Sequence, residues 1–200
     1  MPSRIISTVM TAVAATTGLV ALAAVPASAA GTGMSPTGTL ITFNSSDVTF
    51  KGTLSGIPFS VSCTASSFSF TTPSPIGYGA VNTTDPVFGG TCKDTFGGTA
   101  TVHTNHTNGP WTWLAIQAGP AGTATMPKAG ATFSTATLPG CTVTAAPTGP
   151  VGLNGAYNNL THTWTLNNAP VPFSAVGCGS VSPTGTVSGH FVSTPVMTIS

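Results

Sequence analysis

The sequence predicts an all-β protein, an antiparallel β-sandwich with an Ig-like or Greek-key order and two disulfides. Three observations predict this class. Apolar residues alternate with Ser and Thr at a period of two in many short segments. Clusters of Gly and Pro separate these segments, and the chain holds 24 Gly and 17 Pro. No window combines a helical apolar stripe with a capping signal.

The alternating segments have one apolar face and one hydroxyl face, which is typical of strands in antiparallel sheets. In one of them, Trp111 and Trp113 alternate with Thr112 and Leu114. The clearest segments span residues 48–54, 59–63, 67–70, 100–102, 111–115, 131–135, 161–166, 187–191 and 196–198. Each of these segments is predicted to be a strand or part of one.

The connections between strands are predicted from turn residues. Asn154-Gly155 is the strongest candidate for a tight hairpin. Residues 118–130 form the one candidate linker, but they include a candidate strand, Thr123–Met126. We therefore expect a single secreted β-sandwich domain over residues 30–200 rather than two domains.

Residues 1–29 have the features of a secretory signal peptide. Arg4 supplies the positive start, an apolar stretch follows, and Pro26 precedes an Ala-Ser-Ala cleavage site that ends at Ala29. Cleavage is expected after Ala29, with Ala30 as the alternative. No later segment is long and apolar enough to span a membrane as a helix. The sequence therefore predicts a secreted, extracellular protein that does not remain in the membrane.

The chain carries almost no charge, with four Lys or Arg, three Asp and no Glu. A nucleic-acid binder needs a basic face, and a helical bundle needs many Leu, Glu, Lys and Arg residues, so both classes are excluded. The 37 Thr and 20 Ser must supply most of the polar surface. A nearly neutral surface of this kind favours self-association.

All four cysteines follow the predicted signal peptide. An even count in an exported chain indicates two disulfides, for which three pairings are possible. We favour Cys63–Cys92 with Cys141–Cys178, because each half of the chain then carries one local bridge. A zinc site is disfavoured, because the cysteines are far apart and form no C-x-x-C motif.

Few side chains are available for catalysis. Asp47, Asp85 and Asp94 are the only carboxylate side chains, and their sequence contexts favour turn and cap roles. His103 and His106 would lie on opposite faces of a strand, which is poor geometry for one metal. The G-x-S-x-G elbow of many serine hydrolases is absent. The sequence predicts no enzyme activity, no metal site and no cofactor.

The candidate ligand-binding residues are three tryptophans. Trp111 and Trp113 point to the same side of one predicted strand, and together with Trp164 they would form a flat aromatic platform. Such a platform suits a sugar ring or a hydrophobic chain. The alternative is that all three lie in the core, because the chain has few other large residues. The sequence leaves both alternatives open.

The final third of the chain has a recognisable pattern over residues 138–141, 155–169, 177–189 and 196–199. In this pattern it resembles small exported bacterial β-proteins known as activators of alkane oxidation, which are connected with biofilm matrix and surface attachment. Gly109-Pro110-Trp111 stands where that group has a Leu-Pro-Trp turn. The N-terminal region departs from the group. The resemblance implies an extracellular or cell-surface protein that is not an enzyme, and it carries over no catalytic residue.

These observations predict a non-catalytic secreted or cell-surface protein of the structural or adhesion type. Its partner would be a second copy, a cell-wall polymer or another surface protein. The alternative is an extracellular glycan- or hydrophobe-binding module that uses an aromatic face.

Overall fold

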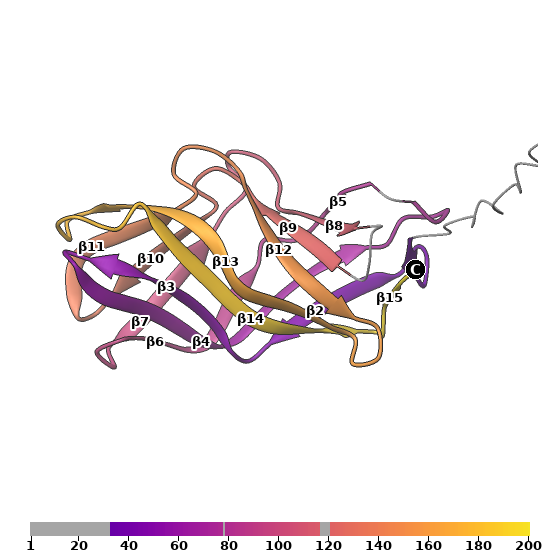
Figure 1. Ribbon diagram of the computed structural model, residues 1–200, viewed down its shortest axis with the longest axis horizontal. Coiled ribbons are helices and arrows are strands. Elements are labelled where there is room, and N and C mark those ends of the chain that lie inside the picture. Colours follow the sequence, from indigo (N-terminus) through magenta and orange to yellow (C-terminus); the bar gives the residue numbers. More distant parts are fainter. Residues whose placement is uncertain (1–32, 78, 117–120) are drawn as a thin grey trace, which may run out of the picture.

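The fold of the described residues is all-β. A computed structural model of the chain describes residues 33–77, 79–116 and 121–200 (Figure 1). Every regular element in these ranges is a strand, and every strand pair is antiparallel, which confirms the predicted class. The predicted signal peptide, residues 1–29, lies outside the described residues.

The strands differ widely in length, from two residues to fifteen. In chain order they are β1 (Met34–Ser35), β2 (Leu40–Ser45), β3 (Val48–Leu54), β4 (Ile57–Thr71), β5 (Val81–Asn82), β6 (Val87–Asp94), β7 (Thr99–Thr104), β8 (Thr112–Ile116), β9 (Ala121–Met126), β10 (Ala131–Thr135), β11 (Leu138–Ala145), β12 (Val151–Asn158), β13 (Thr163–Val176), β14 (Thr184–Thr194) and β15 (Thr198–Ile199).

Eight of these strands close into a barrel. The order around it is β14, β3, β4, β6, β7, β10, β11 and β13, and the pairing of β13 with β14 completes the ring. This closed arrangement corrects the predicted sandwich of two facing sheets. A barrel and a sandwich both turn alternate residues inward, so the alternation along one strand does not distinguish them.

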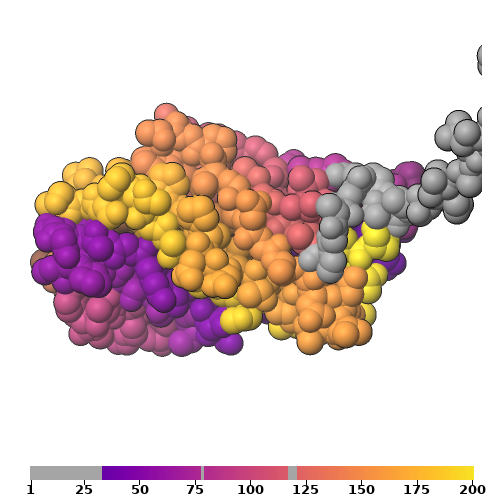
Figure 2. Space-filling view, viewed as in Figure 1, coloured from indigo at the N-terminus to yellow at the C-terminus, as the bar shows by residue number. Residues whose placement is uncertain are grey.

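The long strands continue past the barrel and form a second end of the molecule. There β2 replaces β3 between β14 and β4. Strands β12, β9, β8 and β5 follow one another outward from β13. The N–H of Thr84, just after β5, donates to the carbonyl oxygen of Ser69 on β4 at 2.8 Å. The result is the elongated body of Figure 2, along which the C-terminal strands run.

Aromatic side chains fill the interior at both ends. At the barrel end, Phe50 packs against Phe133 with ring centroids 4.6 Å apart. At the other end, Phe43 contacts a larger group of rings, namely Phe68, Phe70, Trp113, Tyr157 and Trp164. Burial of these large apolar surfaces is the main term that stabilises the fold.

The outer surface carries hydroxyl groups in place of charges. Neighbouring strands present Ser and Thr opposite one another, and many of these side chains hydrogen bond in pairs. Thr42 and Ser69 are joined at 2.8 Å between β2 and β4, and Thr49 and Ser62 at 2.9 Å between β3 and β4. These cross-strand pairs give the Ser and Thr hydroxyls hydrogen-bond partners and link neighbouring strands without ion pairs.

Both disulfides have the predicted pairing. Cys63 and Cys92 lie directly opposite each other on β4 and β6, with an S–S distance of 2.04 Å. Cys141 of β11 is joined to Cys178, just after β13, with an S–S distance of 2.16 Å. Disulfides persist in oxidising surroundings, so the pairs indicate an oxidising, extracellular type of environment.

Two predicted connections are strands instead. The predicted hairpin turn at Asn154-Gly155 is wrong, because both residues lie inside β12 and pair with Thr123 and Gly122 of β9. The candidate strand Thr123–Met126 is confirmed as most of β9, which pairs on both sides. An Asn-Gly pair is typical of a tight turn, but a glycine inside a strand also occurs where a neighbouring side chain approaches the backbone closely.

Candidate functional site

The three candidate tryptophans lie in the core. Trp111, Trp113 and Trp164 are 4%, 0% and 1% exposed. The predicted alternative of a flat exposed platform is therefore wrong, and the alternative of a core role holds. Trp113 stacks on Phe70 with centroids 5.2 Å apart and planes inclined by 12°. A chain with few large residues needs these rings inside to reach native packing density.

A small apolar cavity lies beside two of these tryptophans. It has a volume of about 40 Å³. Its wall includes Trp111, Trp164, Phe50 and Leu166, together with the polar side chain of Ser66. Strands from both ends of the molecule contribute to the wall, so the cavity lies where the barrel and the second end meet.

An open hollow of about 530 Å³ lies outside this cavity. It is formed by the connection between β5 and β6 and the connection between β7 and β8, and Thr83 borders both the hollow and the cavity. The Nδ1 atom of His106 lies 2.8 Å from Oδ2 of Asp85 across the hollow. The indole N–H of Trp111 donates to the carbonyl oxygen of Asn105, which fixes the second connection.

A second aspartate–histidine pair joins β14 to the break between β2 and β3. Nδ1 of His190 lies 2.5 Å from Oδ2 of Asp47, and the backbone N–H of His190 donates to Oδ1. Burial raises the pKa of Asp47, but the hydrogen bonds from His190 and Ser45 outweigh this effect and lower the pKa below its ordinary value. The pair holds the bend between β2 and β3 against β14.

Asp94 has the turn role that the sequence predicts. Its Oδ1 accepts the N–H groups of Phe96 and Gly98 in the β6–β7 turn, and its Oδ2 accepts the hydroxyl of Thr137. Burial raises the pKa of Asp94, while these hydrogen bonds lower it by more, so that its pKa lies below the ordinary value. This carboxylate fastens the β6–β7 turn to the β10–β11 turn.

The remaining histidines do not assemble a metal centre. His103 is exposed on β7, and His106 lies beyond the end of that strand beside Asp85. Nδ1 of His162 lies 3.0 Å from the carbonyl oxygen of Met197. Within residues 33–77, 79–116 and 121–200, no three His, Cys, Asp or Glu side chains gather closely enough to hold a metal ion.

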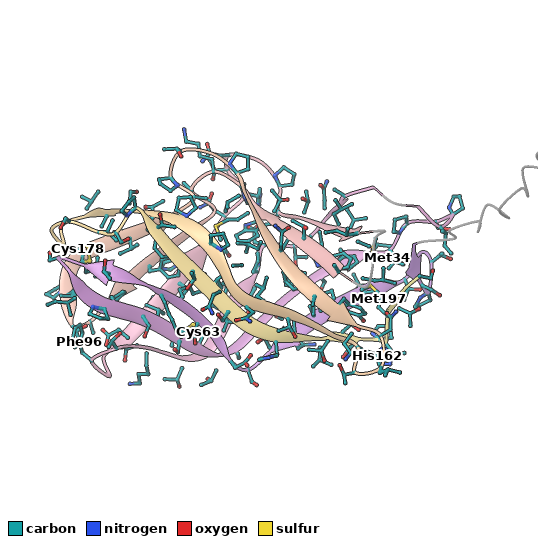
Figure 3. All side chains as sticks on the ribbon, in the orientation of Figure 1. Met34, Cys63, Phe96, His162, Cys178 and Met197 are labelled. Carbon is teal, nitrogen blue, oxygen red and sulfur yellow. A yellow bond between two sulfur atoms is a disulfide. The ribbon has the colours of Figure 1, made fainter. Side chains whose placement is uncertain are left out.

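One end of the barrel carries exposed apolar side chains around a groove of about 150 Å³. Ile57 and Phe96 are each 57% exposed, and both line the groove. Pro58, Phe59 and Leu138 also line it. We call this surface the apolar end, defined by Ile57, Pro58, Phe59, Phe96 and Leu138. Figure 3 labels Phe96 and Cys178 at this end of the molecule and His162 at the opposite end.

The apolar end is built by tight turns and one disulfide. Ile57 begins β4 directly after Gly56 of the β3–β4 turn, and the β6–β7 turn supplies Phe96 next to Gly97. The N–H of Ser55 donates to the carbonyl oxygen of Ser180 at 2.6 Å, which ties the first turn to the loop after β13. The Cys141–Cys178 disulfide fixes that loop to β11.

Sequence reasoning did not single out the apolar end. Its signal is present in the sequence, since Gly56-Ile57-Pro58 and Phe96-Gly97 each place a large apolar residue inside a turn cluster. Turn residues are normally exposed, so an apolar residue there indicates a contact surface. The sequence alone does not show that the two turns meet at one end of the barrel.

No protein-family model, curated protein or solved structure matches this chain. The resemblance of the final third to the exported alkane-oxidation activators stays a prediction. In the part of the chain that the structure describes, no helix is long and apolar enough to cross a membrane.

Proposed function

We propose that this chain is a non-catalytic extracellular protein of the structural or adhesion type, which associates with a second copy of itself through the apolar end. The observation that carries this proposal is the groove of about 150 Å³, lined by Ile57 and Phe96, each 57% exposed. Large apolar side chains that gather around a groove on a protein surface mark an interaction site.

The shape of the apolar end favours a second copy as its partner. The exposed Phe96 and the apolar groove belong to the same patch. A contact with two-fold symmetry uses the same patch on both copies, so the apolar side chains of each copy can pack against the groove of the other. Specific stable interfaces bury about 1,200–2,000 Å² in total. A patch of a few side chains falls below that range, so we expect a weak, concentration-dependent association.

Charge does not oppose such a contact. The whole chain has a formal net charge of +1, and removal of residues 1–29 with Arg4 would leave three lysines against three aspartates. Copies of a nearly neutral protein approach one another without long-range repulsion. Weak association is effective where the local concentration is high, as it is for a secreted protein that accumulates at a cell surface. Secretion itself is proposed from the signal-like residues 1–29 and the two disulfides.

Sedimentation velocity over a concentration series tests the proposal. The purified protein should change from monomer toward dimer as concentration rises, and Phe96→Ser should shift this transition to higher concentration. Leu160→Ser is the matched control, because Leu160 is 91% exposed but lies in the β12–β13 turn at the other end. An equal effect of both substitutions would overturn the apolar end as the contact. If the protein stays monomeric at all concentrations but sediments with cell-wall polymer, the proposal of a second copy is wrong and the polymer is the partner.

A further inference from the structure

Ser66 is a polar residue at an inward-facing position of β4. It is 5% exposed, and its hydroxyl has no hydrogen-bond partner among the described residues. The neighbouring inward residues on the same strand are Cys63 and Phe68, which are both buried and apolar in character. A buried hydroxyl without a partner destabilises a protein, so this side chain needs an explanation.

The apolar cavity of about 40 Å³ borders this hydroxyl. Three other polar groups of the wall already have hydrogen-bond partners. The indole N–H of Trp111 donates to the carbonyl oxygen of Asn105, the indole N–H of Trp164 donates to that of Gly122, and the hydroxyl of Thr83 donates to that of Thr84. A water molecule in a buried site needs about two to four polar partners. Apart from Ser66 and Thr112, the groups that line the cavity are apolar or already hydrogen-bonded, so the cavity suits water poorly.

We propose that this cavity is a binding site for a short-chain alcohol, a mostly apolar molecule with one oxygen. The Ser66 hydroxyl would hydrogen bond that oxygen, and the rings of Trp111 and Trp164 would pack against the hydrocarbon part. A cavity of about 150 Å³ holds the six heavy atoms of benzene, so a cavity of about 40 Å³ fits a molecule of about two heavy atoms, which is the size of methanol. This site is independent of the apolar end and of the association proposed there.

The hollow outside gives the ligand a route to the cavity. Thr83 belongs to the walls of both, and the connection from Thr83 to Pro86 separates them. This connection contains no regular secondary structure and is fastened to the opposite connection by the Asp85–His106 contact of 2.8 Å. Displacement of these few residues would open the cavity to the hollow; it would break the hydrogen bonds from the N–H of Thr83 to Trp111 and from the N–H of Thr84 to Ser69, but no strand pair of the barrel.

Two probes separate occupation of the cavity from hydrogen bonding to Ser66. Methanol carries the hydroxyl, whereas xenon is apolar and only fills space. In the intact protein we expect intermolecular nuclear Overhauser effects from methanol to the ring protons of Trp111 and Trp164, with saturable chemical-shift changes at the same rings for both probes. Ser66→Ala should leave the response to xenon and weaken methanol binding about tenfold, the effect of losing one hydrogen bond.

Matched variants complete the test. Ser66→Val should fill the cavity and abolish the response to both probes while the protein stays folded. Ser67→Ala, at the next and outward-facing position, should change neither response. Equal binding of methanol by the native protein and Ser66→Ala would overturn the proposal. So would the absence of any ring response to methanol, or an ordered water held by Ser66 in a crystal grown with methanol. None of these outcomes depends on whether the protein associates through its apolar end.

Discussion

The indole of Trp164 lies against the backbone of Gly155, where a Cβ atom would stand 2.4 Å from Nε1 and 2.6 Å from the carbonyl oxygen of Thr165. Gly122 on the neighbouring strand has the same relationship with Trp113, because a Cβ atom at Gly122 would stand 2.3 Å from Cζ2 of that indole. The glycines of β9 and β12 thus make room for the two indoles at the centre of the core. This close approach, rather than a turn, is the reason for glycine at position 155.

Gly155→Ala should destabilise the protein, because the added methyl group collides with the indole and with a backbone oxygen that cannot move freely. Overpacking of a core typically lowers the free energy of unfolding by about 1–3 kcal/mol. Gly89→Ala is the control, since a Cβ at Gly89 in β6 meets nothing within 4 Å. Chemical denaturation of both variants measures the effect. Equal stability of the two variants would show that the indole does not occupy this position.

Asp94 should make stability depend on pH. Its pKa in the folded protein lies below the ordinary value of 3.8, because the hydrogen bonds it accepts outweigh the effect of burial. Ionised Asp94 therefore stabilises the fold above the pKa of the unfolded chain, and this stabilisation is lost as pH falls through the folded value. Asp94→Asn should lower the free energy of unfolding at neutral pH by about 1–3 kcal/mol.

The difference between native protein and Asp94→Asn should shrink as pH falls below the ordinary pKa of 3.8, and it should disappear once pH falls through the lower pKa of the folded protein, where the native carboxylate becomes protonated. Asp47 also has a lowered pKa, but it is present in both proteins and cancels from the difference. Denaturation curves from neutral pH to the acid range measure this comparison. A difference that stays constant across that range would mean that the charge of Asp94 contributes nothing to stability.

The Cys63–Cys92 disulfide should contribute strongly to stability, because it joins residues that are 29 positions apart in sequence. Replacement of both cysteines by Ala should lower the free energy of unfolding by about 2–4 kcal/mol, mainly through the greater freedom of the unfolded chain. Thermal denaturation under non-reducing conditions measures the loss. Peptide mapping of the native protein should recover a Cys63–Cys92 peptide, and a Cys63–Cys141 peptide would contradict the fold.

The sequence predicted the strands well because burial alternates along each of them. In β8, Trp113 and Ala115 are buried, whereas Thr112 and Leu114 are only half-buried, as the alternation indicates. Closure of the barrel was not predictable in this way. It depends on β13 pairing with β11 and β14 along its length, a long-range register that local alternation does not contain.

The sites were less predictable because they depend on irregularities and on distant contacts. A register shift between Cys63 and Ala65 reverses the alternation of β4, so Ser66 points inward where a regular strand would turn it outward. The Asp47–His190 contact joins residues 143 positions apart. The burial of the tryptophans was not predictable either, because two rings two positions apart share one face of a strand whether that face is exposed or buried.

The measurement that tests the central claim most directly is a comparison of backbone amide chemical shifts between dilute and concentrated protein. Self-association through the apolar end predicts that the changes gather at Ile57, Phe59, Phe96 and Leu138 and are small around Leu160 in the opposite turn. The same changes should disappear in Phe96→Ser. Changes gathered on the hydroxyl-covered faces of the barrel, or no changes at any concentration, would contradict the account.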